Sequence, residues 1–218
     1  MNDQAVADDY LRAMFTADGG PGVVKAALAG ALARLESDPH GAANLVLLEQ
    51  AWAAPKAHVL GLTGPPGVGK SSLTAALIRA WRQLGETVAV LAVDPSSRRS
   101  GGALLGDRVR LRTDPEDGGI FVRSMAARDR LGGLAPHSFP AMVLMRAVFD
   151  HVILETVGVG QSETDIAGVA DTVLVCIQPG SGDSLQYMKA GIAEVPDIVA
   201  VTKADMAMLA DRALADVK

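Results

Sequence analysis

The stretch His58-Val59-Leu60-Gly61-Leu62-Thr63-Gly64-Pro65-Pro66-Gly67-Val68-Gly69-Lys70-Ser71 decides the fold of this chain. Its first six residues form a short apolar run, its last eight fit the pattern G-x-x-x-x-G-K-[ST], and helical spacing follows from Ser71 to Leu84. A strand that ends in such a loop and leads into a helix is typical of a phosphate-binding loop, because glycines let main-chain N–H groups turn inward around phosphate oxygens. The alternative is a plain turn rich in glycine and proline.

If this loop binds a nucleotide, each of its polar groups has a predicted role. The helix N-terminus contributes partial positive charge, Lys70 reaches the β- and γ-phosphates, and the hydroxyl of Ser71 ligates Mg²⁺. The predicted nucleotide contacts of the loop are Gly64, Pro65, Pro66, Gly67, Val68, Gly69, Lys70, Ser71 and Ser72.

After Pro55 the chain alternates between short apolar runs and helical patterns. Beyond the first strand, the predicted strands are Thr87 to Val93, His151 to Leu154, Thr172 to Ile177 and Ile198 to Val201. Runs with no polar break are buried on both faces, as in a parallel sheet covered by helices. We therefore predict an α/β fold of the P-loop NTPase class, with a mostly parallel sheet covered by helices on both faces.

The first 55 residues have a different character, and we predict a helical extension over residues 1–55 and the nucleotide-binding domain over residues 56–218. The turn signals Gly19 to Gly22 and Asp38 to Gly41 split the extension into about three helices. One apolar stripe runs through Val23, Ala27, Leu28, Leu32 and Leu35. No catalytic pattern occurs there, so we interpret the extension as a cap packed on the main domain.

The composition excludes several classes of function. With 49% apolar residues, 21% charged residues and a net charge of −5, the chain has no basic footprint for a nucleic acid. The single cysteine, Cys176, cannot form an internal disulfide, and the N-terminus has no signal-peptide pattern, so we expect a cytoplasmic protein. The apolar runs are too short to cross a membrane.

Acidic residues follow the predicted strands, where ligands of a parallel sheet bind. Asp94 and Glu155 come directly after two strands, and Asp107 lies in a nearby turn. Carboxylates there can hold Mg²⁺ or order its water, and Glu155 can also position an attacking water. The alternatives are a capping aspartate at 94, a solvated turn carboxylate at 107 and a strand-ending glutamate at 155. Gly158 can offer its N–H to the γ-phosphate, and the turn up to Gln161 is a candidate hinge.

The segment Thr202-Lys203-Ala204-Asp205 follows the last predicted strand and resembles the N-K-x-D base-specificity motif of GTPases. Asp205 would accept hydrogen bonds from N1–H and the exocyclic amine of guanine, whereas adenine would leave that carboxylate unpaired. Lys203 would lay its methylenes along the base. Thr202 replaces the usual asparagine and keeps a hydroxyl but no amide. The alternative is a helix N-cap at Thr202.

Together these motifs resemble the MeaB/ArgK-type GTPases, chaperones of methylmalonyl-CoA mutase and related adenosylcobalamin-dependent acyl-CoA mutases. The resemblance covers about Ala31 to Asp205. Besides the phosphate loop, the matching blocks are Val90 to Ser97, Ser100 to Asp107, Glu155 to Glu163 and Pro179 to Gln186.

The resemblance implies slow GTP hydrolysis without a partner and a GTP-dependent gate on cofactor loading and protection of the mutase. It implies Mg²⁺ held at Ser71, Asp94, Asp107 and Glu155, with catalytic roles for Lys70, Glu155, Gly158 and Gln161. The segment Pro179 to Gly191, with Asp183, resembles an additional switch in which Lys189 reaches a nucleotide across a subunit interface. The alternative for Lys189 is a plain surface lysine.

The chain departs from the family pattern in two places. After Arg123 the usual small polar residues are replaced by Ser124-Met125-Ala126-Ala127-Arg128, although Arg123 and Arg128 could still neutralise transition-state charge. The family also continues beyond the base motif with a guanine-contacting loop and a homodimerisation arm, whereas this chain ends after Lys218. We therefore expect a truncated form without the dimer arm, and weaker GDP binding than in a full-length relative.

Three other functions stay open at the level of sequence. The first is a P-loop kinase that acts on a small molecule or a transport protein, and the second is a nucleotide-bound interaction module without useful turnover. The third is nickel delivery, as in metal-chaperone relatives of this GTPase class, although His40, His58, His137 and His151 are scattered rather than clustered.

Overall fold

A computed structural model of the chain describes residues 3–15, 20–94, 111, 113–126, 137–156, 166–179, 196–206 and 208–217. Within these residues, six parallel strands form one sheet in the order β3-β2-β4-β1-β5-β6. The strands are β1 His58–Thr63, β2 Val88–Asp94, β3 Ile120–Ala126, β4 His151–Thr156, β5 Thr172–Ile177 and β6 Ile198–Val201. The predicted parallel α/β fold is therefore confirmed.

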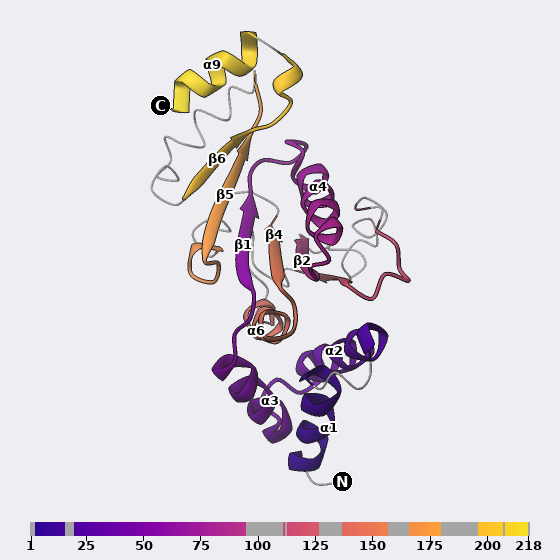
Figure 1. Cartoon of the computed structure of the whole chain (residues 1–218). Coiled ribbons are helices and arrows are strands. Elements are labelled where there is room, and N and C mark those ends of the chain that lie inside the picture. The colour runs from indigo at the N-terminus through magenta and orange to yellow at the C-terminus, as the bar shows by residue number, and fades with distance from the viewer. Residues whose placement is uncertain are drawn as a thin grey trace.

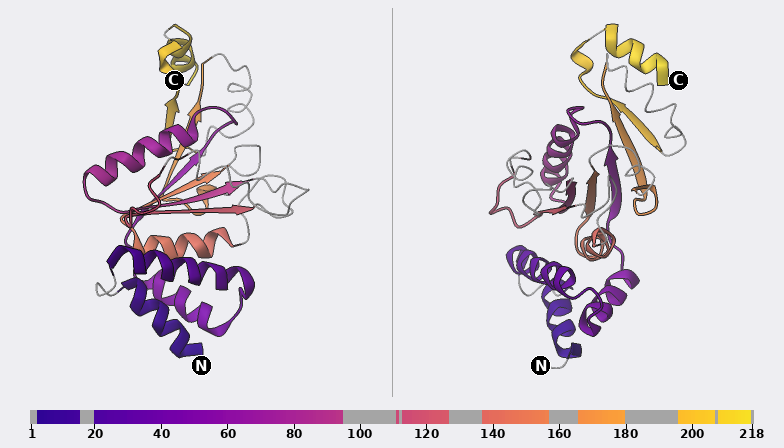
Figure 2. Two further views of the ribbon diagram at one scale, coloured as in Figure 1. Left: turned by 90° about the vertical axis from the view of Figure 1, so that its right-hand side faces the viewer. Right: turned by 180° about the vertical axis from the view of Figure 1, so that it is seen from behind.

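Helices cover both faces of the sheet (Figures 1 and 2). Helix α4, Lys70–Gln83, lies on one face, and α6, Ser138–Val148, lies on the other. The apolar runs explain this arrangement, because successive side chains of a strand point to opposite faces. In β2, Val88 and Val90 belong to the core on the α4 side, and the alternate residues Ala89, Leu91 and Val93 belong to the core on the α6 side.

The helical extension forms a further layer outside α6, at the bottom of Figure 1. Its helices are α1 Asp3–Phe15, α2 Gly20–Ser37 and α3 Ala42–Ala53, and α2 and α3 both pack on α6. Of the predicted stripe, Leu28, Leu32 and Leu35 are buried, but Val23 is 45% exposed. Including Val23 was wrong, because five helical residues turn the side chain about 140° away from Leu28.

The edge strand β3, Ile120–Ala126, was not predicted. Arg123 and Ser124 interrupt its apolar run, and an ion pair 2.6 Å long joins Arg123 to Glu36 of α2. An edge strand that carries a charged side chain on the α2 side does not give the unbroken apolar signal of a central strand.

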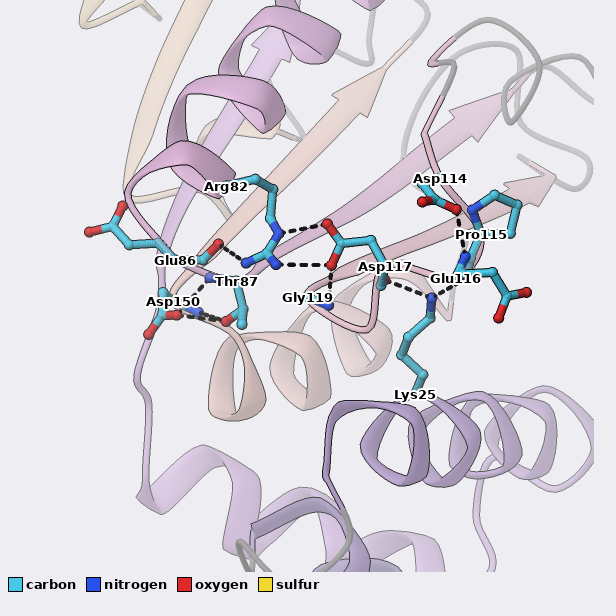
Figure 3. Close-up of polar contacts among 10 residues, drawn as sticks. All are labelled: Lys25, Arg82, Glu86, Thr87, Asp114, Pro115, Glu116, Asp117, Gly119 and Asp150. Carbon is cyan, nitrogen blue, oxygen red and sulfur yellow. Dashed lines mark hydrogen bonds and ion pairs between the residues drawn. The ribbon is translucent and has the colours of Figure 1, made fainter.

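The loop before β3 is held from two helices (Figure 3). Lys25 of α2 donates to the main-chain oxygens of Pro115 and Asp117, at 2.9 and 3.0 Å. Arg82 of α4 donates to both carboxylate oxygens of Asp117 at 2.9 Å, and this hydrogen bonding lowers the pKa of Asp117. The main-chain N–H of Gly119 donates to the same carboxylate. The loop thus joins the two helical layers across the end of the sheet.

The chain continues from β6 into the short helix η3, Ala204–Met206, and the helix α9, Met208–Val217, at the top of Figure 1. In the part of the chain that the structure describes, no helix has the length and apolar character needed to cross a bilayer.

Candidate functional site

The predicted phosphate loop connects the end of β1 to the start of α4. Gly64, Gly67 and Gly69 all have positive φ, at 138°, 75° and 107°, a region that side chains disfavour. A Cβ atom on Gly64 would lie 2.3 Å from the main-chain oxygen of Cys176, so this glycine is also required by close packing. Around Gly67, by contrast, nothing lies within 4 Å of such an atom. The loop therefore rests on β5 at its start and opens to solvent at its tip.

Two side chains shape the inside of this loop. Val68 is fully buried in the core on the α4 side and anchors the loop to the sheet. Lys70 is 8% exposed, and its Nζ donates to the main-chain oxygens of Gly64 at 2.6 Å and Pro65 at 3.1 Å. A lysine ammonium group is thereby held within the curve of the loop, at the N-terminus of a helix, where a phosphate would find two sources of positive charge.

The carboxylate of Glu155 meets this loop from the neighbouring strand β4. The hydroxyl of Ser71 donates to Oε1 of Glu155 at 2.8 Å, so the structure brings together two of the predicted magnesium ligands. Glu155 lies inside β4 rather than after it, because its pairing continues with Leu62 of β1 and Ala92 of β2. The strand thus carries the carboxylate directly beside the first turn of α4.

Thr74 is a residue of this site that the sequence did not single out. It is fully buried in α4, and its hydroxyl donates to the other carboxylate oxygen, Oε2 of Glu155, at 3.0 Å. The signal in the sequence is slight: a threonine three residues after Ser71, next to the core-facing Leu73 and four residues before the buried Ile78. Only the position of β4 reveals its partner.

A second contact joins β4 to β1 behind the loop. The hydroxyl of Thr156 donates to that of Thr63 at 3.1 Å, and both residues are buried. Thr63 precedes Gly64 and Thr156 follows Glu155, so this hydrogen bond helps to fix the position of Glu155 relative to the phosphate loop.

The predicted base loop after β6 is tied to the phosphate loop. The hydroxyl of Thr202 lies within hydrogen-bond distance of the main-chain oxygens of Val68, at 2.6 Å, and Ile177, at 2.9 Å. Lys203 has a φ of 53°, which is costly for a residue with a side chain, and its Nζ donates to Gln178. Asp205 is exposed in η3. Of the three predicted base-recognition residues, Thr202 therefore contacts the phosphate loop directly, and Lys203 and Asp205 follow it in the chain.

Cys176 lies beneath the loop in β5 and is fully buried, as predicted for a strand residue. Burial raises the pKa of its thiol to about 11, with the nearby charges of Lys70 and Glu155 acting in opposite directions. The thiol therefore stays protonated at neutral pH.

Of the remaining predicted site residues, the structure describes the side chain of Arg123, which is not brought to the loop. Arg123 is bound to Glu36 and belongs to the face of the sheet opposite α4, since its alternate neighbours Phe121 and Met125 lie in the core on the α6 side. Asp94 is the last residue of β2, but its side chain lies outside the described part of the chain. The following residues also lie outside it: Asp107, Arg128, Gly158, Gln161, Asp183 and Lys189.

These contacts suit a nucleotide with a divalent cation. The loop offers main-chain N–H groups and a lysine for phosphates, and Ser71 and Glu155 offer hard oxygen atoms, which Mg²⁺ prefers. A hydroxyl can give its lone pair to a metal ion while its hydrogen stays directed at a carboxylate, so the contact between Ser71 and Glu155 is compatible with a bound ion.

Comparison with known proteins points in the same direction. The sequence model of the family described as Methylmalonyl Co-A mutase-associated GTPase MeaB matches residues 28–217. A protein of Pyrococcus horikoshii is 51% identical over 150 residues, which are 68% of this chain and 47% of that protein. The mitochondrial methylmalonic aciduria type A homolog of Mus musculus is 41% identical over 147 residues, which are 67% of this chain and 35% of that protein.

Among solved structures, the chain is similar to the crystal structure of an LAO/AO transport system kinase. The TM-score is 0.69 and the sequence identity 28%, over 99% of this chain and 62% of that one. The chain spans about half the length of curated relatives such as the Pyrococcus protein, at 47%.

Proposed function

Because this chain belongs to the MeaB family of methylmalonyl-CoA mutase-associated GTPases, we propose that it binds GTP with Mg²⁺ and hydrolyses it slowly, as a switch for an adenosylcobalamin-dependent acyl-CoA mutase. The observation that carries the proposal is the contact between the hydroxyl of Ser71 and the carboxylate of Glu155, beside a loop that encloses the ammonium group of Lys70.

Each of these groups has a task in phosphoryl transfer to water. Lys70 moves from the loop oxygens to the β- and γ-phosphates and neutralises the charge that develops between them. Ser71 and Glu155, with Asp94 and Asp107, hold the magnesium ion or its waters. The ion supplies charge neutralisation at the phosphates when it is bound. Gly158 and Gln161 complete the catalytic set, with Gly158 at the γ-phosphate.

The loop after β6 supports guanine as the base. Asp205 is exposed and can accept from two guanine donors, while the stem of Lys203 covers the base. Thr202 holds this loop against Val68, so the distance between the base site and the phosphate site is set by a direct hydrogen bond. We expect adenine nucleotides to bind more weakly because they leave Asp205 unpaired.

The proposed partner is an acyl-CoA mutase such as methylmalonyl-CoA mutase. The family description and the name of the mouse relative support this partner. GTP binding and hydrolysis would gate the loading and protection of the adenosylcobalamin cofactor of the mutase. Asp183, Lys189 and Arg128 belong to the proposed switch that communicates with it, whereas Arg123, which is paired with Glu36 on the other face of the sheet, does not.

A phosphotransferase is the second candidate, since one similar protein of known structure is named a transport system kinase. Such an enzyme would transfer the γ-phosphate to an acceptor other than water. The hydrolytic switch is favoured by the segment Thr202 to Asp205, which suits guanine, the base of nucleotide switches.

Release of inorganic phosphate from GTP tests the proposal, first with the purified chain and then with added methylmalonyl-CoA mutase. We expect a slow, Mg²⁺-dependent release that increases with the mutase and is lost in Ser71→Ala and Glu155→Gln. Ser37→Ala removes a hydroxyl that donates to the Arg34 carbonyl within α2, so it is the matched control and should behave as wild type. If the chain releases no phosphate from GTP with or without the mutase, it is not a GTPase, and if the mutase has no effect, it is not the partner.

A further inference from the structure

On the premise of the proposed GTPase function, we propose that Thr74 is a positioning residue for Glu155. Its buried hydroxyl holds the second carboxylate oxygen of the glutamate, so that the carboxylate faces the magnesium–nucleotide site in one fixed orientation. The role should be visible in how much bound Mg²⁺ increases the affinity for the nucleotide.

Two donors from one helix hold the two oxygens of the carboxylate. Ser71 donates to Oε1 at 2.8 Å and Thr74 to Oε2 at 3.0 Å. Residues three apart lie on the same side of a helix, so α4 presents both hydroxyls to β4 together. A carboxylate bound through both oxygens cannot rotate about its last bond without losing one of the contacts.

A second hydrogen bond, from Thr74, helps to fix the acid because the acid is a glutamate rather than an aspartate. Glutamate has one more side-chain torsion than aspartate and loses more rotamer freedom when it is fixed. The Ser71 oxygen is itself a predicted metal ligand, so its contact with Glu155 responds to the ion. The Thr74 hydroxyl is not among the predicted ligands, so its contact with Oε2 of Glu155 remains as the constant anchor.

The burial and direction of the threonine argue against a merely local role. A threonine inside a helix commonly donates to a main-chain carbonyl one turn back. The Thr74 hydroxyl donates instead to a side chain 81 positions away, and the residue is fully buried. Thr74 lies one helical turn before Ile78 on the buried side of α4, so packing alone would be served equally well by valine.

Calorimetric titration with GDP, in Mg²⁺ and in EDTA, tests the role through binding alone. In Thr74→Val, which keeps the shape and removes the donor, we expect the gain in affinity from Mg²⁺ to fall about tenfold, as for other groups that orient metal ligands. The affinity in EDTA should stay within about twofold of wild type, because no phosphate contact is removed. Thr74→Ser keeps the hydroxyl and should restore the gain.

Two further variants keep the result interpretable. Thr172→Val removes a threonine hydroxyl that bonds His58 at the start of β5, and it should leave the Mg²⁺ gain unchanged. In Glu155→Asp the shorter side chain loses its contact with Thr74. Adding Thr74→Val to this variant should therefore reduce the Mg²⁺-dependent gain in GDP affinity no further.

The outcomes separate this role from the proposed function. If Mg²⁺ strengthens GDP binding in wild type and equally in Thr74→Val, the positioning role is wrong while the GTPase function stands. If Mg²⁺ has no effect on wild type, the proposed magnesium–nucleotide site itself fails. If Thr74→Val and Thr74→Ser lose the gain equally, the threonine acts through packing, which also overturns the role.

Discussion

The hydroxyl of Thr202 lies 2.6 Å from the main-chain oxygen of Val68, so the loop after β6 is bound directly to the phosphate loop. The main-chain N–H of Thr202 also donates to Ile177, the last residue of β5. Threonine therefore supplies a donor to the phosphate loop at the position where the related motif has asparagine, and the base loop keeps its connection without the amide.

Replacing this hydroxyl should weaken nucleotide binding without unfolding the chain. In Thr202→Val we expect GDP to dissociate about five times faster, the loss of roughly one hydrogen bond, and in Thr202→Ser to dissociate as in wild type. Stopped-flow release of a fluorescent GDP analogue measures the rate. Equal rates in all three proteins would show that the contact does not support the base loop.

Gly64 should tolerate no side chain. Gly64→Ala puts a methyl group 2.3 Å from a main-chain oxygen at a φ of 138°, so we expect a loss of about 2–4 kcal/mol in the free energy of unfolding and no GDP binding. Gly67→Ala is the control, because its surroundings are open and only the positive φ opposes it, at about 1–2 kcal/mol. Urea denaturation compares them, and equal losses would contradict the close packing of Gly64 on β5.

Asp150 should make the free energy of unfolding depend on pH in the acidic range. Burial alone would raise the pKa of Asp150, but hydrogen bonds from Lys56 and Thr87 outweigh it and lower the pKa to about 2. A carboxyl group whose pKa is lower in the folded state stabilises that state above the unfolded pKa, about 4, and the contribution is lost as the pH falls through 2.

The size of this contribution can be measured with Asp150→Asn. Near neutral pH the variant should be less stable than wild type by about 1–2 kcal/mol, since solvent screens this partly exposed carboxylate. The part of the difference that comes from ionisation should shrink between pH 4 and pH 2 in urea titrations at several pH values. A difference that stays constant over this range would mean that the Asp150 contacts do not depend on its charge.

Cys176 should be chemically inert in the folded protein. Its thiol is fully buried and its pKa is raised to about 11, so little thiolate forms at neutral pH. A disulfide reagent such as Ellman's should react with it only in denaturant. Rapid reaction of the native chain would show that β5 is open beneath the phosphate loop.

Much of the fold follows from local patterns. The runs His58 to Thr63 and Thr172 to Ile177 matched β1 and β5, because central parallel strands are apolar on both faces. β3 was missed because Arg123 breaks its apolar run, and the partner that explains this charge, Glu36, lies 87 positions earlier in the chain.

The candidate site divides in the same way. The loop from Gly64 to Ser71 is contiguous, so its sequence pattern alone predicts a phosphate site. The contact of Thr74 with Glu155 could not be predicted, because the fold of β4 brings the two residues together. Similarly, the side chain of Thr202 could be linked to a base motif by its sequence, but its contact with Val68 depends on how β6 lies beside β5.

Calorimetric titration of the purified chain with GDP and with ADP, each with Mg²⁺, tests the central claim most directly. If Asp205 reads guanine beside the phosphate loop, GDP should bind at least about tenfold more tightly than ADP, and Asp205→Asn should remove most of this preference. Equal or tighter binding of ADP would contradict the GTPase function and favour a phosphotransferase.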